Sequence, residues 1–119
     1  MSAPTEAGLA RMVVAYVQPH RAQAVLEALH RVPGVSGATL VHAHGFGRGR
    51  SAETAPENVA GTSERARVEV VVPEALEDLV VRAIRDAAHT GQRGDGKVYV
   101  LPVGRAVRVS TGEEGEAAI

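Results

Sequence analysis

The sequence predicts an α+β fold in which two amphipathic helices cover one face of an antiparallel sheet. The order strand–helix–strand occurs twice along the chain, and a long segment without periodicity, 45–63, separates the two units. Two such units with both helices on one face make the ferredoxin-like βαββαβ arrangement. A chain of 119 residues suits one domain with a modest core, so 1–119 is predicted to form a single domain.

Composition excludes several classes of protein. The chain has no cysteine, which rules out disulfides, thiol catalysis and cysteine zinc sites and fits a reducing compartment. A net charge of -1 without a basic face argues against nucleic acid as a partner. No apolar run approaches the roughly 18 residues of a membrane span, and the N-terminus lacks a signal pattern. We therefore expect a soluble, cytoplasmic protein, and the few aromatic residues suggest that oligomerisation supplements a thin core.

The first strand–helix–strand unit follows a small, polar segment, 1–10, which we expect to be a loose leader. The continuous apolar run 12–17 predicts a strand covered on both faces, and Pro19 is well placed to begin a helix. Alternation over 38–44 predicts the second strand. The helix between the strands shows apolar residues at a spacing of three or four: Ala22, Val25, Leu26 and Leu29.

The second unit begins with alternation over 65–72, which predicts a strand, and Pro73 is expected to begin its helix. Short apolar segments at 98–101 and 106–109 predict the fourth strand and an extra C-terminal strand. The acidic segment 112–119 is expected to be a mobile tail. The buried stripe of the helix is predicted to comprise Leu76, Leu79, Val80, Ala83, Ile84 and Ala87.

A glycine-rich segment, 90–97, connects the second helix to the fourth strand. Gly91, Gly96 and Lys97 match the GxxxxGK spacing of a phosphate-binding loop, in which backbone N–H groups surround the phosphates, and Gly94 lies among the four residues between the two glycines. A nucleotide hydrolase of that type is not expected, because a helix precedes the segment and Val98 occupies the position of the magnesium-binding Ser or Thr. Two interpretations remain: an anion-binding loop, or a helix cap at Gly91 followed by a turn.

A second glycine stretch, Gly45-Phe46-Gly47-Arg48, also ends in a cation. If the fold brings the two stretches together, their N–H groups and cations form a phosphate site, to which Arg108 adds charge. Glu69, on the polar face of its strand, would then accept hydrogen bonds from ribose or base groups. The alternative is a set of surface charges scattered by chance.

Two histidines offer a different site. His42 and His44 share one side of a strand, and neutral imidazole suits zinc, copper or nickel. No nearby carboxylate pattern completes a metal site, so two exposed polar side chains are the alternative. Neither a Ser–His–Asp order nor paired carboxylates suggest a hydrolytic site.

With these stretches assembled, the sequence resembles the PII signal-transduction family. The resemblance rests on 45–48, 67–73, 90–97 and 107–113, and it extends from 12 to 119 in matching order. It implies a homotrimer that is not an enzyme. Such a trimer binds adenine nucleotide (ATP, ADP or AMP), with magnesium left open, in clefts between subunits. It reports metabolic state to a partner protein through the long loop 45–63.

The resemblance also implies the residues of each site. The partner-binding loop would use Gly49, Arg50 and Ser51. The nucleotide-binding positions would be Thr39, Gly45, Gly47, Arg48, Glu69, Val71, Gly94, Asp95, Gly96, Lys97, Arg108 and Ser110.

Several positions depart from the family pattern. Gly49 replaces a glutamine that helps to bind magnesium and 2-oxoglutarate, Arg65 replaces a lysine, and Ser110 replaces a phosphate-binding arginine. The tyrosine that many members have modified in the loop is missing. We therefore expect ADP or AMP to be accepted and 2-oxoglutarate control to be lost. The Gly-Arg-Gly-Arg loop resembles a branch associated with metal efflux or transport, which suggests a membrane transporter as partner. The rival is a metal-binding protein of the same architecture that uses His42 and His44.

Overall fold

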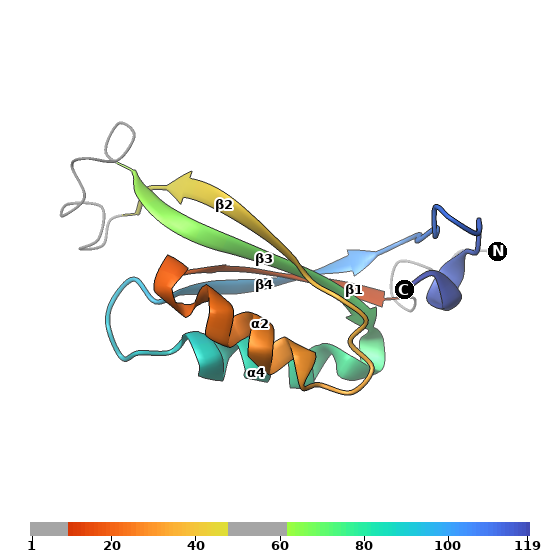
Figure 1. Cartoon of the computed structure of the whole chain (residues 1–119), viewed down its shortest axis with the longest axis horizontal. Coiled ribbons are helices and arrows are strands. Elements are labelled where there is room, and N and C mark those ends of the chain that lie inside the picture. The colour runs from red at the N-terminus through yellow and green to blue at the C-terminus, as the bar shows by residue number, and fades with distance from the viewer. Residues whose placement is uncertain (1–9, 48–61) are drawn as a thin grey trace.

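The computed structural model describes residues 10–47 and 62–119 (Figure 1). Residues 1–9 of the predicted leader and the central part of the long loop, with Arg48, Gly49, Arg50 and Ser51, lie outside the described residues, whereas Ala10, the last residue of the predicted leader, begins β1. The strands are β1 (Ala10–Val17), β2 (Thr39–Gly45), β3 (Ser63–Pro73) and β4 (Gly96–Val103). The helices are α2 (Ala22–His30) and α4 (Glu77–Ala88), and short 3₁₀ turns occur at η1 (Pro19–Arg21), η3 (Glu74–Leu76) and η4 (Gly115–Ala118).

The strands form one antiparallel sheet in the order β2-β3-β1-β4. β1 lies inside the sheet, where Val14 is paired with Glu69 of β3 on one side and with Tyr99 of β4 on the other. Both helices pack on the same face of the sheet, as Figure 1 shows. The predicted α+β, ferredoxin-like fold is therefore confirmed.

The core lies between the sheet and the helices. Alternate positions of β1 and β3, among them Val13, Val68 and Val72, are fully buried and pack against α2 and α4. Leu29 and Ile84 are the largest side chains that the helices contribute to this fully buried set. Fully burying one such side chain stabilises the fold by about 1.5–3 kcal/mol. No described helix has the length and apolar composition that crossing a bilayer requires.

The second helix differs from the prediction at its start and on its buried face. Pro73 is the last residue of β3, with an extended ψ of 153°, and α4 begins only at Glu77 after the η3 turn. Leu79, predicted to be buried, is 48% exposed. The buried positions are Val80, Ile84 and Ala88, four residues apart, so Leu79 lies about 100° around the helix from Val80.

The predicted extra strand at 106–109 does not join the sheet. Val107 makes one isolated bridge with Glu114, and the N–H of Arg108 donates to the carbonyl of Glu113 at 2.8 Å. A turn with Gly112 at a φ of 77° reverses the chain directly after this segment. The backbone groups are therefore satisfied by the following residues instead of by the edge of β4.

The segment predicted as an acidic tail, 112–119, folds back along the chain. It contains η4, and the Ser36 hydroxyl donates to the carbonyl of Ile119 at 3.2 Å. This contact places the end of the chain beside the connection that precedes β2.

Gly96 is a position where only glycine fits. Its φ is 124°, and a Cβ built there would lie 1.9 Å from the backbone oxygen of Tyr16. We expect Gly96→Ala to lower the free energy of unfolding by about 1–3 kcal/mol, the range for a strained backbone position. Urea denaturation would measure the change.

Gly104→Ala is the matched control, because nothing lies within 4 Å of its built Cβ. Equal stabilities of the two variants would contradict the close approach of β4 to β1.

Candidate functional site

The sheet face opposite the helices presents a row of polar and aromatic side chains. Register places Tyr16 of β1 between Arg67 of β3 and Lys97 of β4. Arg67 Nη1 donates to the Tyr16 hydroxyl at 3.0 Å. Arg67 also forms an ion pair with Glu69, with 2.6 Å between Nε and Oε2. The angle at the Nε–H does not meet that of a hydrogen bond. The Tyr16 and Tyr99 rings meet edge to face, 6.4 Å apart. This row separates two concavities of the surface.

The first, which we name the glycine-loop concavity, has a volume of about 700 Å³. It unites the end of β2 with the α4–β4 connection, two glycine-rich segments that are far apart in the sequence. The predicted convergence of these stretches therefore occurs within one chain, apart from Arg48, which the structure does not describe. The lining residues are Tyr16, Gly45, Phe46, Gly47, Arg65, Gln92, Arg93, Gly94, Asp95, Gly96, Lys97 and Tyr99.

The second, the C-terminal concavity, has a volume of about 510 Å³. Of the predicted nucleotide-binding residues, it brings together Thr39, Glu69, Val71 and Arg108. Its other lining residues are Met12, Ser36, Gly37, Ala38, Val70, Ala118 and Ile119. Ser110, predicted with this group, lies exposed in the turn after Val109 and lines neither concavity.

Arg108 is held by its own segment. Its Nε lies 3.6 Å from Glu113 Oε1, and its Nη2 donates to the carbonyl of Ala117 at 3.4 Å. The guanidinium is therefore at the rim of the C-terminal concavity, in contact with the segment that leads into η4.

The two concavities lie at different points along β1. Met12 lines one and Tyr16 the other, and four residues of strand span about 13 Å. In Figure 1 the α4–β4 connection and η4 are at opposite ends of the molecule. A single chain therefore does not gather all the predicted nucleotide-binding residues in one place.

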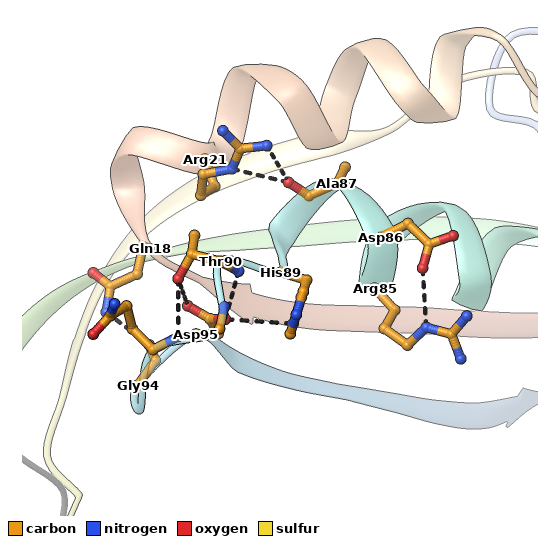
Figure 2. A network of polar contacts seen from close by, with 11 residues as sticks. Gln18, Arg21, Arg85, Asp86, Ala87, His89, Thr90, Gly94 and Asp95 are labelled. Atoms are coloured by element: carbon orange, nitrogen blue, oxygen red, sulfur yellow. Dashed lines mark hydrogen bonds and ion pairs between the residues drawn. The ribbon is translucent and has the colours of Figure 1, made fainter.

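Asp95 folds the glycine-rich segment 90–97, which we call the glycine loop, back on itself (Figure 2). Its Oδ2 accepts the N–H groups of Thr90 and Gly91 at 2.7 and 3.0 Å, and its Oδ1 accepts the Thr90 hydroxyl. These bonds, the Thr90 hydroxyl first, hold the pKa of the Asp95 carboxyl below its ordinary value, and His89 adds a smaller charge effect. Although Asp95 was predicted to touch nucleotide, its carboxylate is directed to the backbone of its own loop.

The end of α4 differs from the predicted cap at Gly91. The helix ends at Ala88, and His89 has an extended backbone with ψ of 127°. Arg21 closes the helix instead, because its Nε and Nη2 donate to the carbonyl of Ala87 at 2.9 and 2.6 Å. Gly91, with a φ of 88°, belongs to the turn that Asp95 organises.

Two residues near the loop, Arg93 and Gln18, were missed in the sequence as site residues. Arg93 lines the glycine-loop concavity beside Lys97, as does Arg65, which the resemblance had marked as the replacement of a lysine. Gln18 Nε2 donates to the carbonyl of Gly94 at 2.7 Å. The arginines were visible as charges near glycine segments, but a lone glutamine after a strand gives no sequence signal.

The histidine pair occupies the other face of β2. His42 and His44 are paired with Ala66 and Glu64 of β3, so their side chains share one side of the sheet as predicted. Within 10–47 and 62–119, no group of three His, Asp or Glu side chains is placed to hold a metal. The metal site stays a prediction that rests on two ligands.

Acid is expected to weaken the Asp95 turn. The folded-state pKa lies below the ordinary 3.8, so the stabilisation is complete above that value and is lost as pH falls through the folded pKa. Asp95→Asn cannot titrate, and we expect it to be less stable than the parent near neutral pH. Its unfolding free energy should change less than the parent's between about pH 5 and pH 2.

Urea denaturation across this range measures both slopes. Asp86→Asn, which removes an exposed carboxylate paired with Arg85, is the control. Parallel curves for the parent and Asp95→Asn would contradict the assignment.

Comparison with known proteins matches residues 10–113 to the family described as nitrogen regulatory protein P-II. The P-II protein of Azospirillum brasilense is 39% identical over 112 residues, which cover 92% of this chain and 99% of that protein. Nitrogen regulatory protein P-II 1 of Escherichia coli K12 is 36% identical with the same coverage.

A crystal structure of Arabidopsis thaliana PII bound to citrate has the same fold. It aligns with a TM-score of 0.78 and 34% identity, covering 94% of each chain. A family match over most of the chain, together with relatives of this identity and a shared fold, leads to one conclusion. This chain belongs to the nitrogen regulatory protein P-II family of signalling proteins.

Proposed function

We propose that this chain is a non-enzymatic signalling subunit that binds an adenine nucleotide between neighbouring copies and regulates a partner protein. The observation that supports this best is the division of the predicted ligand residues between two concavities on one sheet face. Each concavity supplies one kind of contact, so a complete site needs one concavity from each of two copies.

The glycine-loop concavity suits the phosphates. Arg65, Arg93 and Lys97 line it, and among the lining residues that the structure describes Asp95 alone is acidic. The Asp95 carboxylate keeps its charge but is directed to the N–H groups of Thr90 and Gly91, and three cations outnumber it among the described lining positions. Glycine-rich backbone and cations are the groups that bind phosphate in proteins.

The C-terminal concavity suits the nucleoside. The Glu69 carboxylate can accept hydrogen bonds from ribose or amino groups, and the Thr39 hydroxyl can donate or accept. Val71 and Met12 provide apolar surface for a base. Arg108 adds a cation at the rim, where it would reach phosphates held mainly by the neighbouring copy.

Exposed apolar side chains support association on this face. Val41, Tyr99 and Leu101 are 41%, 48% and 46% exposed, and register places them with Tyr16 on the side that no helix covers. Large apolar side chains exposed on an uncovered sheet face are typical of association sites. A rotational arrangement of copies places different surfaces in contact and closes into a ring, so we propose the homotrimer of the family pattern.

Ligand choice and partner follow from the departures in sequence. Without a cation at Ser110, we propose that ADP and AMP bind as well as ATP, with magnesium optional. The loop 45–63, with Gly49, Arg50 and Ser51, is proposed to contact the partner, and a membrane transporter is the class that its sequence favours.

Nucleotide binding is expected to depend on Lys97. A charge-assisted hydrogen bond contributes about 1.5–3 kcal/mol, so Lys97→Ala should weaken ADP binding by roughly one to two orders of magnitude. Isothermal titration with ATP, ADP and AMP measures this directly.

Arg82→Ala removes the same charge from α4, where Arg82 is paired with Asp78, and should bind normally. If adding nucleotide to the parent protein produced neither binding heat nor a rise in melting temperature, the proposal would be refuted.

A second prediction tests whether the site lies between copies. Lys97→Ala damages the glycine-loop concavity, and Arg108→Ala damages the C-terminal one. Neither variant alone should bind ADP well. Refolding the two together should restore about a quarter of the sites, because in a ring some interfaces receive both intact halves.

Titration and analytical ultracentrifugation of the mixture give the number of sites and the assembly. If mixing restores nothing while the variants still form rings together, both residues serve a site within one chain.

A further inference from the structure

The α4–β4 connection is tied to the core by a side chain outside the glycine-loop concavity. Gln18, between β1 and η1, has an extended backbone and donates its Nε2–H to the carbonyl of Gly94 at 2.7 Å. Figure 2 shows this amide reaching the loop at Gly94, next to the contacts between Asp95 and Thr90. We infer that Gln18 is a positioning residue that holds the glycine loop in its anion-accepting conformation. The inference rests on the proposed function, in which this loop binds phosphate.

The geometry of the peptide unit explains the effect. The described chain has no cis peptide, and in a planar trans unit the C=O and the following N–H point in opposite directions. When the Gly94 carbonyl is bound to Gln18, the N–H of Asp95 is directed away from Gln18. Gln18 does not line the concavity, whereas Gly94, Asp95 and Gly96 do. The bond therefore turns a carbonyl away from an incoming anion and leaves an N–H on the opposite side.

The loop needs this tie because the side-chain hydrogen bonds within it hold Thr90, Gly91 and Gln92 but not the Gly94 carbonyl. Asp95 fixes the N–H groups of Thr90 and Gly91, and Gly96 is fixed by its close approach to Tyr16. Gly94 lies between these anchors with a φ of 90°. Glycine accepts many backbone conformations, so without a partner the Gly94 carbonyl would also sample orientations that face the anion.

A purely structural role for Gln18 predicts a different outcome. If the bond only stabilised the fold, its loss would lower the melting temperature and affect every ligand alike. A positioning role predicts loss for ligands with phosphate, such as ADP and tripolyphosphate, and little change for adenosine.

The experiment uses the full chain with Gln18→Ala and Gln18→Lys. A net hydrogen bond corresponds to a change of about three- to tenfold in affinity, and we expect Gln18→Ala to lose this factor for ADP and tripolyphosphate. Lysine can donate to the same carbonyl, so Gln18→Lys should retain most of the affinity. Gln23→Ala and Gln23→Lys, at an exposed position of α2, are the matched controls.

Titration calorimetry with the three ligands, together with melting temperatures, separates the outcomes. Selective loss of the phosphorylated ligands in Gln18→Ala, with rescue by lysine, supports the inference. Parental affinity in Gln18→Ala overturns it and leaves the proposed function intact, as does an equal loss for adenosine and ADP. If the parent protein binds no nucleotide at all, the proposed function fails, and this inference fails with it.

Discussion

The position of β1 inside the sheet is the constraint on which the rest of the structure depends. Hydrogen bonds to β3 and β4 fix both edges of β1, so its side chains alternate strictly between the two faces. The side chains of Val13 and Val17 pack in the core beneath the helices, so those of Met12 and Tyr16 lie on the opposite face of the sheet. Both concavities therefore open on the same side of the sheet, and their separation is set by the rise of one strand.

The glycine loop shows how a short connection can separate charges of opposite sign. Its acidic residue, Asp95, turns inward to the backbone of Thr90 and Gly91. Its cations, Arg93 and Lys97, line the concavity without an acidic partner from the loop. The Asp95 carboxylate keeps its charge, so what it contributes to an anion site is the shape of the loop that its hydrogen bonds fix.

Much of this arrangement could be predicted from the sequence, because periodicity reports directly on which face of an element is buried. The alternation around Val68 and the helical spacing around Leu29 were sufficient for the elements and their order. Two of the details that were wrong have causes that lie outside the local pattern. The phase of α4, which exposes Leu79, depends on the η3 turn. Whether 106–109 joins the sheet depends on whether its backbone forms hydrogen bonds with the edge of β4 or with the residues that follow it.

The site was predictable in part. Glycine and cation spacing indicated that the segments around Gly47 and Lys97 could meet, and the fold brings Gly45 and Gly47 beside 94–97. That the remaining residues, such as Glu69, lie in a separate concavity could not be read from spacing, since it depends on strand register. Gln18 gave no signal because its partner is a backbone carbonyl, and any residue type offers one of those.

Gly45 has a double position with a mechanical consequence. It is the last residue of β2, paired with Ser63 at the root of the long loop, and it is also a wall of the glycine-loop concavity. An occupant of the concavity and the root of the loop therefore share one residue, Gly45. A backbone change at Gly45 on ligand binding would therefore reach the root of the loop directly, because the same residue belongs to both.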